Sequence, residues 1–347
     1  MEQVVMCYVL CVMCSMKIIF AGTPDFAVPS LKTLIKHFDV CAVITQPDRP
    51  CGRGQKIKQS PVKEAVLEYN QQDKIKNIPI FTQPINQLFN QLTKLQPDLI
   101  VVAAYGQILS QKILDIPRIG AINIHASLLP KYRGPSPIQA AILNGGEHTG
   151  ISIIKMTSKL DAGPIIAKAK IKITADETAG SLHDKLARLG AELLEKTLSY
   201  HPERLPADKA GSERSRQKFF SAKLANQNDA KATYVKKITK SDAQLDLSKP
   251  AQILERQIRA YNPWPGAWIQ ILNSKFKIQN SNIKKLKILR AKIKHKNSQT
   301  ALPTIPCGDG NLLILTEVQP EGKKRMSGEE FARGYLENRL HKINNKI

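Results

Sequence analysis

Residues 17–45, KIIFAGTPDFAVPSLKTLIKHFDVCAVIT, contain the pattern that decides the fold. Two short runs rich in Ile and Val, KIIFAG and VCAVIT, flank the segment PSLKTLIKHF, in which apolar residues recur at helical spacing. A buried strand, a helix and a second buried strand in this order are typical of a parallel βαβ unit. The stretch therefore predicts an α/β protein built on a parallel sheet.

The same alternation continues along the chain. Further apolar strands are predicted at DLIVVAA (98–104), GAINIH (120–125) and GISIIKM (150–156). Helical spacing recurs in segments 60–69, 85–95, 137–145 and 178–200. Nearly continuous apolar strands indicate that both faces of the sheet are covered. We therefore predict, over residues 16–203, a Rossmann-like, mostly parallel sheet with helices on both faces.

The character of the sequence changes after Tyr200. Residues 204–230 are polar and carry Pro, Gly and Ser, which is the composition of an exposed linker. From 231 to 347 the sequence predicts mostly short strands, one amphipathic helix at 250–262 and a last helix at 326–340. Short strands with few helices indicate a small β-barrel as a second domain. The Lys- and Asn-rich stretch 273–300 is predicted to be an enlarged hairpin or loop.

Composition narrows the class of protein. The chain has 347 residues, of which 42% are hydrophobic, which is enough apolar material for folded cores. Its longest apolar run, from Val4 to Cys14, is too short to cross a membrane. Lys and Arg number 52 against 29 Asp and Glu, and most of the surplus lies in residues 201–347. Such a basic region predicts a polyanionic partner, nucleic acid first, although it could serve only solubility.

The N-terminus and the cysteines do not predict a secreted or metal-binding protein. Three of the six cysteines crowd into residues 7–14, and the others have no paired spacing, so neither a disulfide framework nor a metal site is expected. Residues 1–15 lack the positive charge that opens a signal peptide. We interpret them as a non-native or unstructured extension, with Met16 as an alternative start. Free thiols fit a reducing cytoplasm.

Three polar residues are candidates for chemistry. Asn123 and His125 stand two residues apart at the end of a predicted strand, so their side chains leave on the same face. Ligands of open α/β sheets gather at the carboxyl ends of strands. Asp161 follows a later strand within LDAGP, which resembles a turn. The alternative to a chemical role is that Asn123 and His125 are a hydrogen-bonded pair in the core and that Asp161 only begins a turn.

Together the three residues suit acyl transfer to an amine. An amine that attacks a formyl or acyl carbon creates a negative oxygen, to which the Asn123 amide can donate. Neutral His125 can take the amine proton, and a carboxylate such as Asp161 can stabilise the charged imidazole. The loop GTPDF (22–26) is not a GxGxxG motif, which disfavours a nicotinamide dehydrogenase.

Five segments carry a family resemblance: FAGTPDFAVPSL, TQPDRPCGRGQKIKQSPVK, VVAAYGQIL, INIHASLLPKYRGPSPIQ and LDAGP. In this order they resemble the folate-dependent formyltransferases. RAYNPWPGAW and GDGNLLILTEVQPEGKKRMSGEEF resemble the C-terminal domain of those members that formylate the methionine carried by initiator tRNA. The resemblance covers nearly the whole chain from Met16. The residue after Gly163 is Pro164, where bacterial members often carry Asp, and this departure mainly blurs the subfamily.

The resemblance implies specific roles. Asn123, His125 and Asp161 would be the catalytic residues, and a folate site would be bordered by Ser127, Leu128, Leu129 and Pro130. The formyl donor would be 10-formyltetrahydrofolate, the acceptor the α-amino group of methionyl-tRNA and the other product tetrahydrofolate. The second domain would be an OB-like, tRNA-binding barrel. We expect a cytoplasmic monomer without metal.

The basic loop at 47–61 gains a role from the same resemblance. Its glycines, prolines and cationic side chains suit a mobile arm that reaches a phosphate backbone, and Arg53 is its candidate tRNA contact. An ordinary solvated loop is the alternative. Trp264 and Trp268 could stack on bases but are better explained as core and turn residues of the second domain.

Three competing functions stay open on the residues alone. A formyltransferase acting on a small amine, such as glycinamide ribonucleotide or an amino sugar nucleotide, would need neither the basic arm nor the second domain. A non-catalytic tRNA-binding protein would need no base beside an oxyanion donor. A hydrolase that releases formate would share the three residues but admit water.

Overall fold

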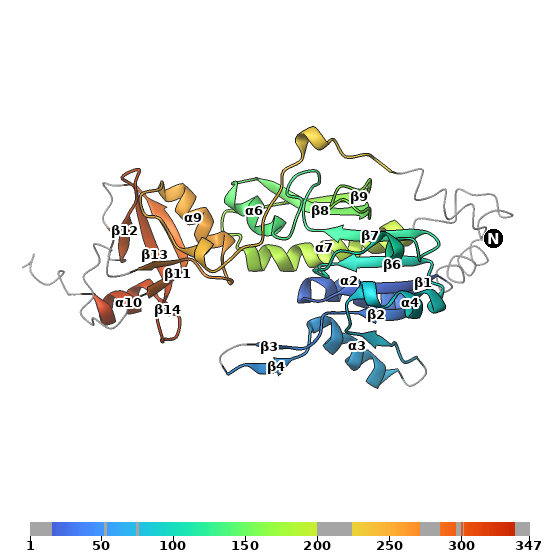
Figure 1. Cartoon of the computed structure of the whole chain (residues 1–347). Helices are drawn as coiled ribbons and strands as arrows, with labels where there is room; N and C mark the ends of the chain where they lie inside the picture. The colour runs from blue at the N-terminus through green and yellow to red at the C-terminus, as the bar shows by residue number, and fades with distance from the viewer. Residues whose placement is uncertain are drawn as a thin grey trace, which may run out of the picture. The chain divides into compact units, whose positions relative to one another are not determined.

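The computed structural model describes residues 16–51, 54–73, 76–199, 224–270, 285–295, 300 and 302–336 (Figure 1). The chain divides into two compact units whose segments interleave. The first comprises residues 1–137, 148–172 and 183–236, and the second comprises 138–147, 173–182 and 237–347. Outside the described residues lie the predicted extension at 1–15, Arg53, residues 204–223 of the predicted linker, and residues 273–284 and 296–299 of the Lys- and Asn-rich stretch.

The first unit is built on a seven-stranded sheet (Figure 1). The strand order is β5 (Ile80–Phe81), β2 (Asp39–Ile44), β1 (Lys17–Gly22), β6 (Leu99–Ala103), β7 (Gly120–His125), β8 (His148–Lys155) and β9 (Ile165–Lys172). Neighbours from β5 to β7 pair in parallel, whereas β8 runs antiparallel to both β7 and β9. The predicted mostly parallel sheet is therefore confirmed.

Helices follow the strands. They are α2 (Val28–His37), α3 (Pro61–Gln72), α4 (Phe89–Leu95), α5 (Gln111–Leu114), α6 (Pro137–Leu143) and α7 (Ala179–Ser199). Apolar spacing predicted all of these except α5. Local chemistry sets their ends. At the start of α3, for example, the Ser60 hydroxyl accepts a hydrogen bond from the Lys63 amide, and Pro61 occupies the first turn, where a missing N–H costs nothing.

Each face of the central strands has its own apolar layer. On one face, Ala121 of β7 belongs to a buried cluster that includes Leu92 of α4 and Ile113 of α5. On the other face, a Cβ placed at Gly190 of α7 would lie 3.1 Å from Cγ2 of Ile124, so this helix packs closely against β7. Side chains alternate along a strand, so Asn123 and His125 lie on the same face as Ala121.

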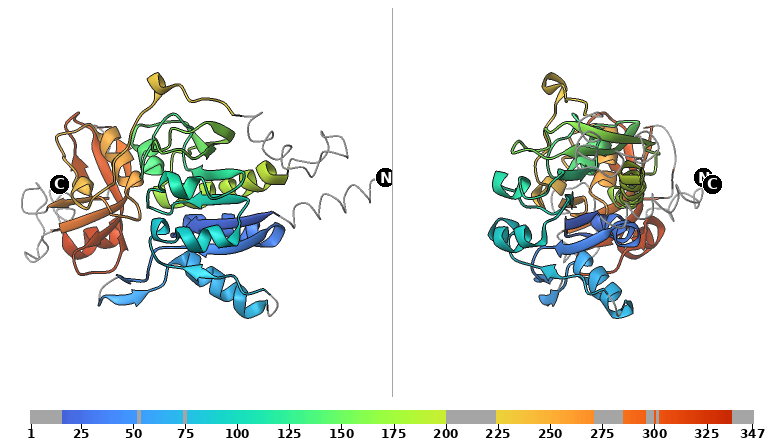
Figure 2. Two further views of the ribbon diagram at one scale, coloured as in Figure 1. Left: turned by 45° about the vertical axis from the view of Figure 1, so that its right-hand side comes forward. Right: turned by 90° about the vertical axis from the view of Figure 1, so that its right-hand side faces the viewer.

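The structure adds elements that the sequence analysis did not predict. Strand β9 is a charged edge strand in which lysines alternate with buried or half-buried residues. The basic loop contains a two-stranded hairpin, β3 (Arg49–Cys51) and β4 (Lys56–Lys58), which projects from the main sheet (Figures 1 and 2). The segment 85–95 is not one helix, because a 3₁₀ turn at Ile85–Gln87 precedes α4.

The second unit contains an antiparallel sheet packed against two helices. Strands β10 (Trp268–Gln270), β11 (Lys285–Lys294), β13 (Leu312–Pro320) and β12 (Thr304–Pro306) pair in this order, and β14 (Met326–Ser327) pairs with β13. Helices α9 (Ala251–Ala260) and α10 (Gly328–Tyr335) contribute Leu254, Ile258 and Phe331 to its core. Among the described residues these pairings do not close into a ring, so the OB-like barrel stays a prediction.

Candidate active site

The candidate site lies on β7 and on the loops that follow it. Asn123 and His125 occupy successive outward positions on the same face of this strand. The imidazole of His125 is nearly buried, with 6% of its side chain exposed, whereas Asn123 is half-buried. The structure thus places the predicted pair side by side at a strand end, where side chains of an α/β sheet can meet a ligand.

Asp161 reaches the same place from the connection between β8 and β9. Its Oδ1 accepts a hydrogen bond from Nδ2 of Asn123 at 3.3 Å, and its Oδ2 lies 3.6 Å from Nδ1 of His125. The backbone amide of Gly134 also donates to Oδ2, at 2.9 Å. The three residues separated along the sequence are therefore brought together, with the carboxylate facing both partners.

The turn that holds Asp161 is tightly constrained. Asp161 itself has a φ of 48°, in the left-handed region that is costly for a residue with a side chain. Two residues later, a Cβ at Gly163 would lie 1.7 Å from the carbonyl oxygen of Lys155, so only glycine fits. Close packing against β8 thus fixes the backbone from which the carboxylate projects.

Hydrogen bonding defines the proton positions on His125. Its Nε2 lies 3.0 Å from the carbonyl oxygen of Tyr132. A carbonyl only accepts, so Nε2 carries the proton and, in the neutral ring, Nδ1 carries the lone pair. Nδ1 is the nitrogen that faces Asp161. The arrangement can accept a proton on Nδ1 and stabilise the resulting imidazolium with the adjacent carboxylate.

The segment predicted to border a folate, Ser127 to Pro130, is anchored by its own hydrogen bonds. Ser127 is fully buried and donates from its hydroxyl to the Lys131 carbonyl at 2.7 Å. The Leu129 amide donates to the Ser152 hydroxyl, and the Leu129 carbonyl accepts from Nζ of Lys168. Burial lowers the pKa of Lys168. Ser127 and Leu129 are therefore buried anchors of this loop, whose backbone they hold in place.

A second anchored loop, residues 104–109, follows β6 and belongs to the motif VVAAYGQIL. Ala104 and Gly106 both have positive φ values, 47° and 81°. The Tyr105 carbonyl accepts from the Thr23 hydroxyl and from the Gln46 amide, which follow β1 and β2. The ends of three parallel strands are thereby joined beside β7, at the edge where ligands of this sheet type bind.

Sequence reasoning also missed a buried arginine and its partners. Arg133 is 1% exposed and donates from Nε and Nη2 to Oε1 of Gln227, at 3.1 and 2.8 Å. It also contacts Asp229 at 2.6 Å and the Tyr234 hydroxyl at 3.1 Å. Burial alone would lower the pKa of Arg133, but its bonds to Asp229 and Tyr234 outweigh burial and raise it. Arg133 belongs to the motif INIHASLLPKYRGPSPIQ, but no sequence pattern marks Gln227, which stands alone in the predicted linker.

The basic hairpin places its cations in solvent. Arg49, Lys56 and Lys58 are exposed on β3 and β4, and Ile57 between the lysines is 76% exposed. At the base of the hairpin, Nζ of Lys63 and Oδ2 of Asp48 pair at 2.7 Å. Arg53, the predicted tRNA contact, falls outside the described residues. Its role stays a prediction.

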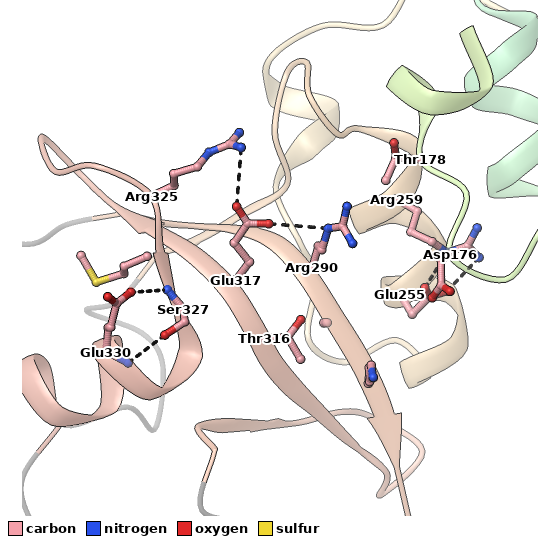
Figure 3. A pocket seen from close by; sticks show the side chains of 13 residues that line it. Asp176, Thr178, Glu255, Arg259, Arg290, Thr316, Glu317, Arg325, Ser327 and Glu330 are labelled. Carbon is pink, nitrogen blue, oxygen red and sulfur yellow. Dashed lines mark hydrogen bonds and ion pairs between the residues drawn. The ribbon is translucent and has the colours of Figure 1, made fainter. Parts of the chain in front are cut away.

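The second unit contains a cavity of about 640 Å³ (Figure 3). Arg290 and Arg325 point toward the same carboxylate, Glu317, each at 3.6 Å. Arg259 instead forms a two-point pair with Glu255. The cavity is lined by Asp176, Thr178, Glu255, Arg259, Arg290, Ala291, Lys292, Thr316, Glu317, Arg325, Met326, Ser327 and Glu330. Four cations and four carboxylates line this cavity, so its charged side chains balance and it is not a basic pocket.

Within the described ranges, no three or more His, Cys, Asp or Glu side chains gather in a group that could hold a metal ion. Every helix in the same ranges is too short or too polar to span a bilayer.

Comparison with known proteins identifies the family. The sequence model of the formyl transferase family matches residues 16–198, and that of the formyl transferase C-terminal domain matches residues 237–336. The chain belongs to the formyl transferase family. Within this family, it is 43% identical to the methionyl-tRNA formyltransferase of Methylococcus capsulatus, over 91% of this chain and 96% of the relative. The methionyl-tRNA formyltransferase of Bacillus subtilis is 40% identical over 92% of this chain and 94% of its own length.

Solved structures of formyl transferases share the fold. The sugar 3N-formyl transferase WlaRD, solved with dTDP and 5-N-formyl-THF, is 19% identical, with a TM-score of 0.57, over 89% of this chain and 99% of that chain. The N-formyltransferase from Helicobacter canadensis, solved with folinic acid and dTDP-3-aminofucose, is 18% identical, also with a TM-score of 0.57, over 88% of this chain and 99% of its own. At these identities the likeness establishes the fold of the formyl transferase family and no substrate.

Proposed function

We propose that this formyl transferase moves a formyl group from 10-formyltetrahydrofolate to the α-amino group of methionyl-tRNA, as initiator tRNA formylation requires. The proposal rests mainly on the 43% sequence identity, over 91% of the chain, to a methionyl-tRNA formyltransferase. Asn123, His125 and Asp161 gathered at one strand end support it chemically.

The geometry suggests how the three residues divide the work. The Asn123 amide has two N–H donors; one points to Asp161, which leaves the other for the oxygen that becomes negative when an amine adds. Nδ1 of His125 is the nitrogen placed to take the proton that the amine loses. Asp161, 3.6 Å from Nδ1, would stabilise that proton on the ring.

The residues around the site fit a folate donor. When bound, 10-formyltetrahydrofolate supplies an activated one-carbon unit as its formyl group. The anchored loops 104–109 and 127–130 follow the neighbouring parallel strands β6 and β7, at the sheet edge where ligands of α/β proteins bind. We propose that part of the folate site is formed by Ser127, Leu128, Leu129 and Pro130.

Basic surfaces favour a tRNA acceptor over a small amine. The exposed cations of the β3–β4 hairpin can contact phosphate oxygens. We propose Arg53 as a contact of the hairpin with tRNA and residues 231–347 as a tRNA-binding, OB-like domain. Each such contact would make tRNA binding weaken as salt rises.

We propose that the protein is a monomer, which size-exclusion chromatography tests. We also propose a cytoplasmic location, because aminoacylated tRNA is used there.

A substrate comparison tests the function. The protein is incubated with 10-formyltetrahydrofolate and, separately, with methionyl-tRNA, glycinamide ribonucleotide, an amino sugar nucleotide or water. Formyl-methionyl-tRNA is the expected product. Formate alone would mean a hydrolase, and formylation of either small amine in preference to the tRNA would assign the alternative acceptor.

Substitutions separate chemistry from tRNA binding. Asn123→Ala, His125→Ala and Asp161→Ala should each abolish most formyl transfer while folding is retained. Arg53→Ala should raise the KM for tRNA and reduce the steepness of its salt dependence, with little change in kcat. An Arg53→Ala protein with an unchanged salt dependence would remove this residue from the proposed tRNA surface.

A further inference from the structure

The turn that presents Asp161 is held from outside by one side chain. Nε2 of Gln227 donates to the carbonyl oxygen of Asp161 at 2.8 Å and to that of Gly163 at 2.7 Å. An amide nitrogen has two hydrogens, so both are used on this turn. The Gln227 side chain therefore bridges the two carbonyls on either side of Ala162.

The other end of the same amide is fixed by a buried charge. Oε1 of Gln227 accepts from Nε and Nη2 of Arg133, at 3.1 and 2.8 Å. Arg133 is 1% exposed, so its charge depends on these contacts and on Asp229. A guanidinium orients an amide oxygen firmly, which also aims the amide nitrogen at the turn.

The backbone beside Arg133 completes the arrangement. The amide of Gly134 donates to Oδ2 of Asp161, and the carbonyl of Tyr132 accepts from Nε2 of His125. This strand-like stretch is itself paired with residues 233–235, since the Arg133 amide donates to the Thr233 carbonyl and the Val235 amide donates to the Arg133 carbonyl, both at 2.8 Å. Gln227 and residues 233–235 thus brace both partners of the proposed proton transfer.

We propose that Gln227 is a positioning residue for formyl transfer and that it acts through Asp161. Gln227 lies in the segment between the two matched family domains. This inference rests on the proposed function for its activity assay. Asp161 has a strained φ of 48°, and the two hydrogen bonds from Gln227 keep its carboxylate directed at Asn123 and His125. Without them the turn can relax and the carboxylate can leave its partners.

Gln227→Glu is the decisive variant. The new carboxylate keeps the acceptor that Arg133 needs, but it has no N–H for the carbonyls of Asp161 and Gly163. We expect kcat to fall by roughly 10- to 100-fold, because small misplacements of reacting groups have effects of this size, while KM for both substrates stays within about threefold. Gln227→Ala removes the same donors without a new charge and carries the same expectation if Gln227→Glu does not fold.

Asn228→Asp is the matched control. It makes the same amide-to-carboxylate change one residue away, and Asn228 uses only its side-chain oxygen, which accepts from the Ala230 amide. An aspartate keeps that bond, so kcat and thermal stability should equal the wild-type values. If Gln227→Glu matched the wild type as Asn228→Asp does, or if its loss were in KM alone, the positioning role would be wrong.

A double variant tests the route through Asp161. In single-turnover measurements, Gln227→Glu should cause no further loss in an Asp161→Ala background, whereas an independent role would multiply the two losses. If the wild type formylates no tRNA, the proposed function fails separately. The crystal structure of Gln227→Glu then decides: loss of the 2.9 Å bond from the Gly134 amide to Asp161 supports the inference, and an unchanged carboxylate overturns it.

Discussion

Gly163→Ala should impair catalysis more than it impairs folding. A Cβ at this position would lie 1.7 Å from the carbonyl oxygen of Lys155, whereas ordinary van der Waals contact begins at 3.4 Å. The turn therefore has to move by about 1.7 Å, the difference between these distances. Because Asp161 is two residues away on the same turn, the displacement carries its carboxylate away from His125. A shift of this order costs about 100-fold in kcat.

The assay measures formation of formyl-methionyl-tRNA alongside urea unfolding. The free energy of unfolding of Gly163→Ala should fall by about 1–3 kcal/mol, which is the usual cost of an inserted methyl group. Gly308→Ala is the matched control, because its Cβ would also lie 1.7 Å from a carbonyl oxygen, that of Ser248 in the second unit. It should lose comparable stability and keep kcat. A Gly163→Ala protein with kcat within twofold of wild type would refute the reasoning.

Three further outcomes follow from other contacts. His183→Gln removes the hydrogen bond to Asp25, which raises the pKa of His183 above 6.5 and lowers the pKa of Asp25 below 3.8. The variant should lose under about 1 kcal/mol of stability, because Asp25 is exposed, and the loss should be largest between pH 3.8 and 6.5. It should shrink as pH rises through the raised pKa of His183, and a loss that grows above that pKa would contradict this reasoning. Leu254→Ala, at a fully buried position, should destabilise the second unit by about 2–5 kcal/mol in urea unfolding, and a loss below about 1 kcal/mol would argue against that core. Lys168→Met removes the donor to the Leu129 carbonyl and should destabilise the first unit by about 1 kcal/mol; a more stable variant would show that desolvation of the lysine dominates.

The sequence predicted the framework because its signals were local and periodic. Strand β7 combines an apolar alternation with two polar residues at its end, so the shared face of Asn123 and His125 follows from the period of a strand. The sheet and most helices follow from the same kind of spacing. Strand β9 was not predicted, because the strands were identified from apolar runs. In β9, lysines alternate with half-buried residues, which is the pattern of a charged edge strand.

The rest of the site depends on contacts between distant residues. That Asp161 faces His125 is decided by how the β8–β9 connection folds back, and no spacing in the sequence encodes that distance. Gln227 is less predictable still, because it stands alone in a polar stretch whose composition indicates only a linker. Motif resemblance named Asp161, but it gave no reason to connect it with Gln227.

The bracing by Gln227 and residues 233–235 affects how the enzyme can be divided into fragments. A fragment that ends at residue 198, where the first family match stops, would contain Asn123, His125 and Asp161 but no Gln227. Arg133 would then be a buried cation deprived of Gln227, Asp229 and Tyr234. The smallest autonomous version of this catalyst therefore has to extend to about residue 236, well into sequence that looks dispensable.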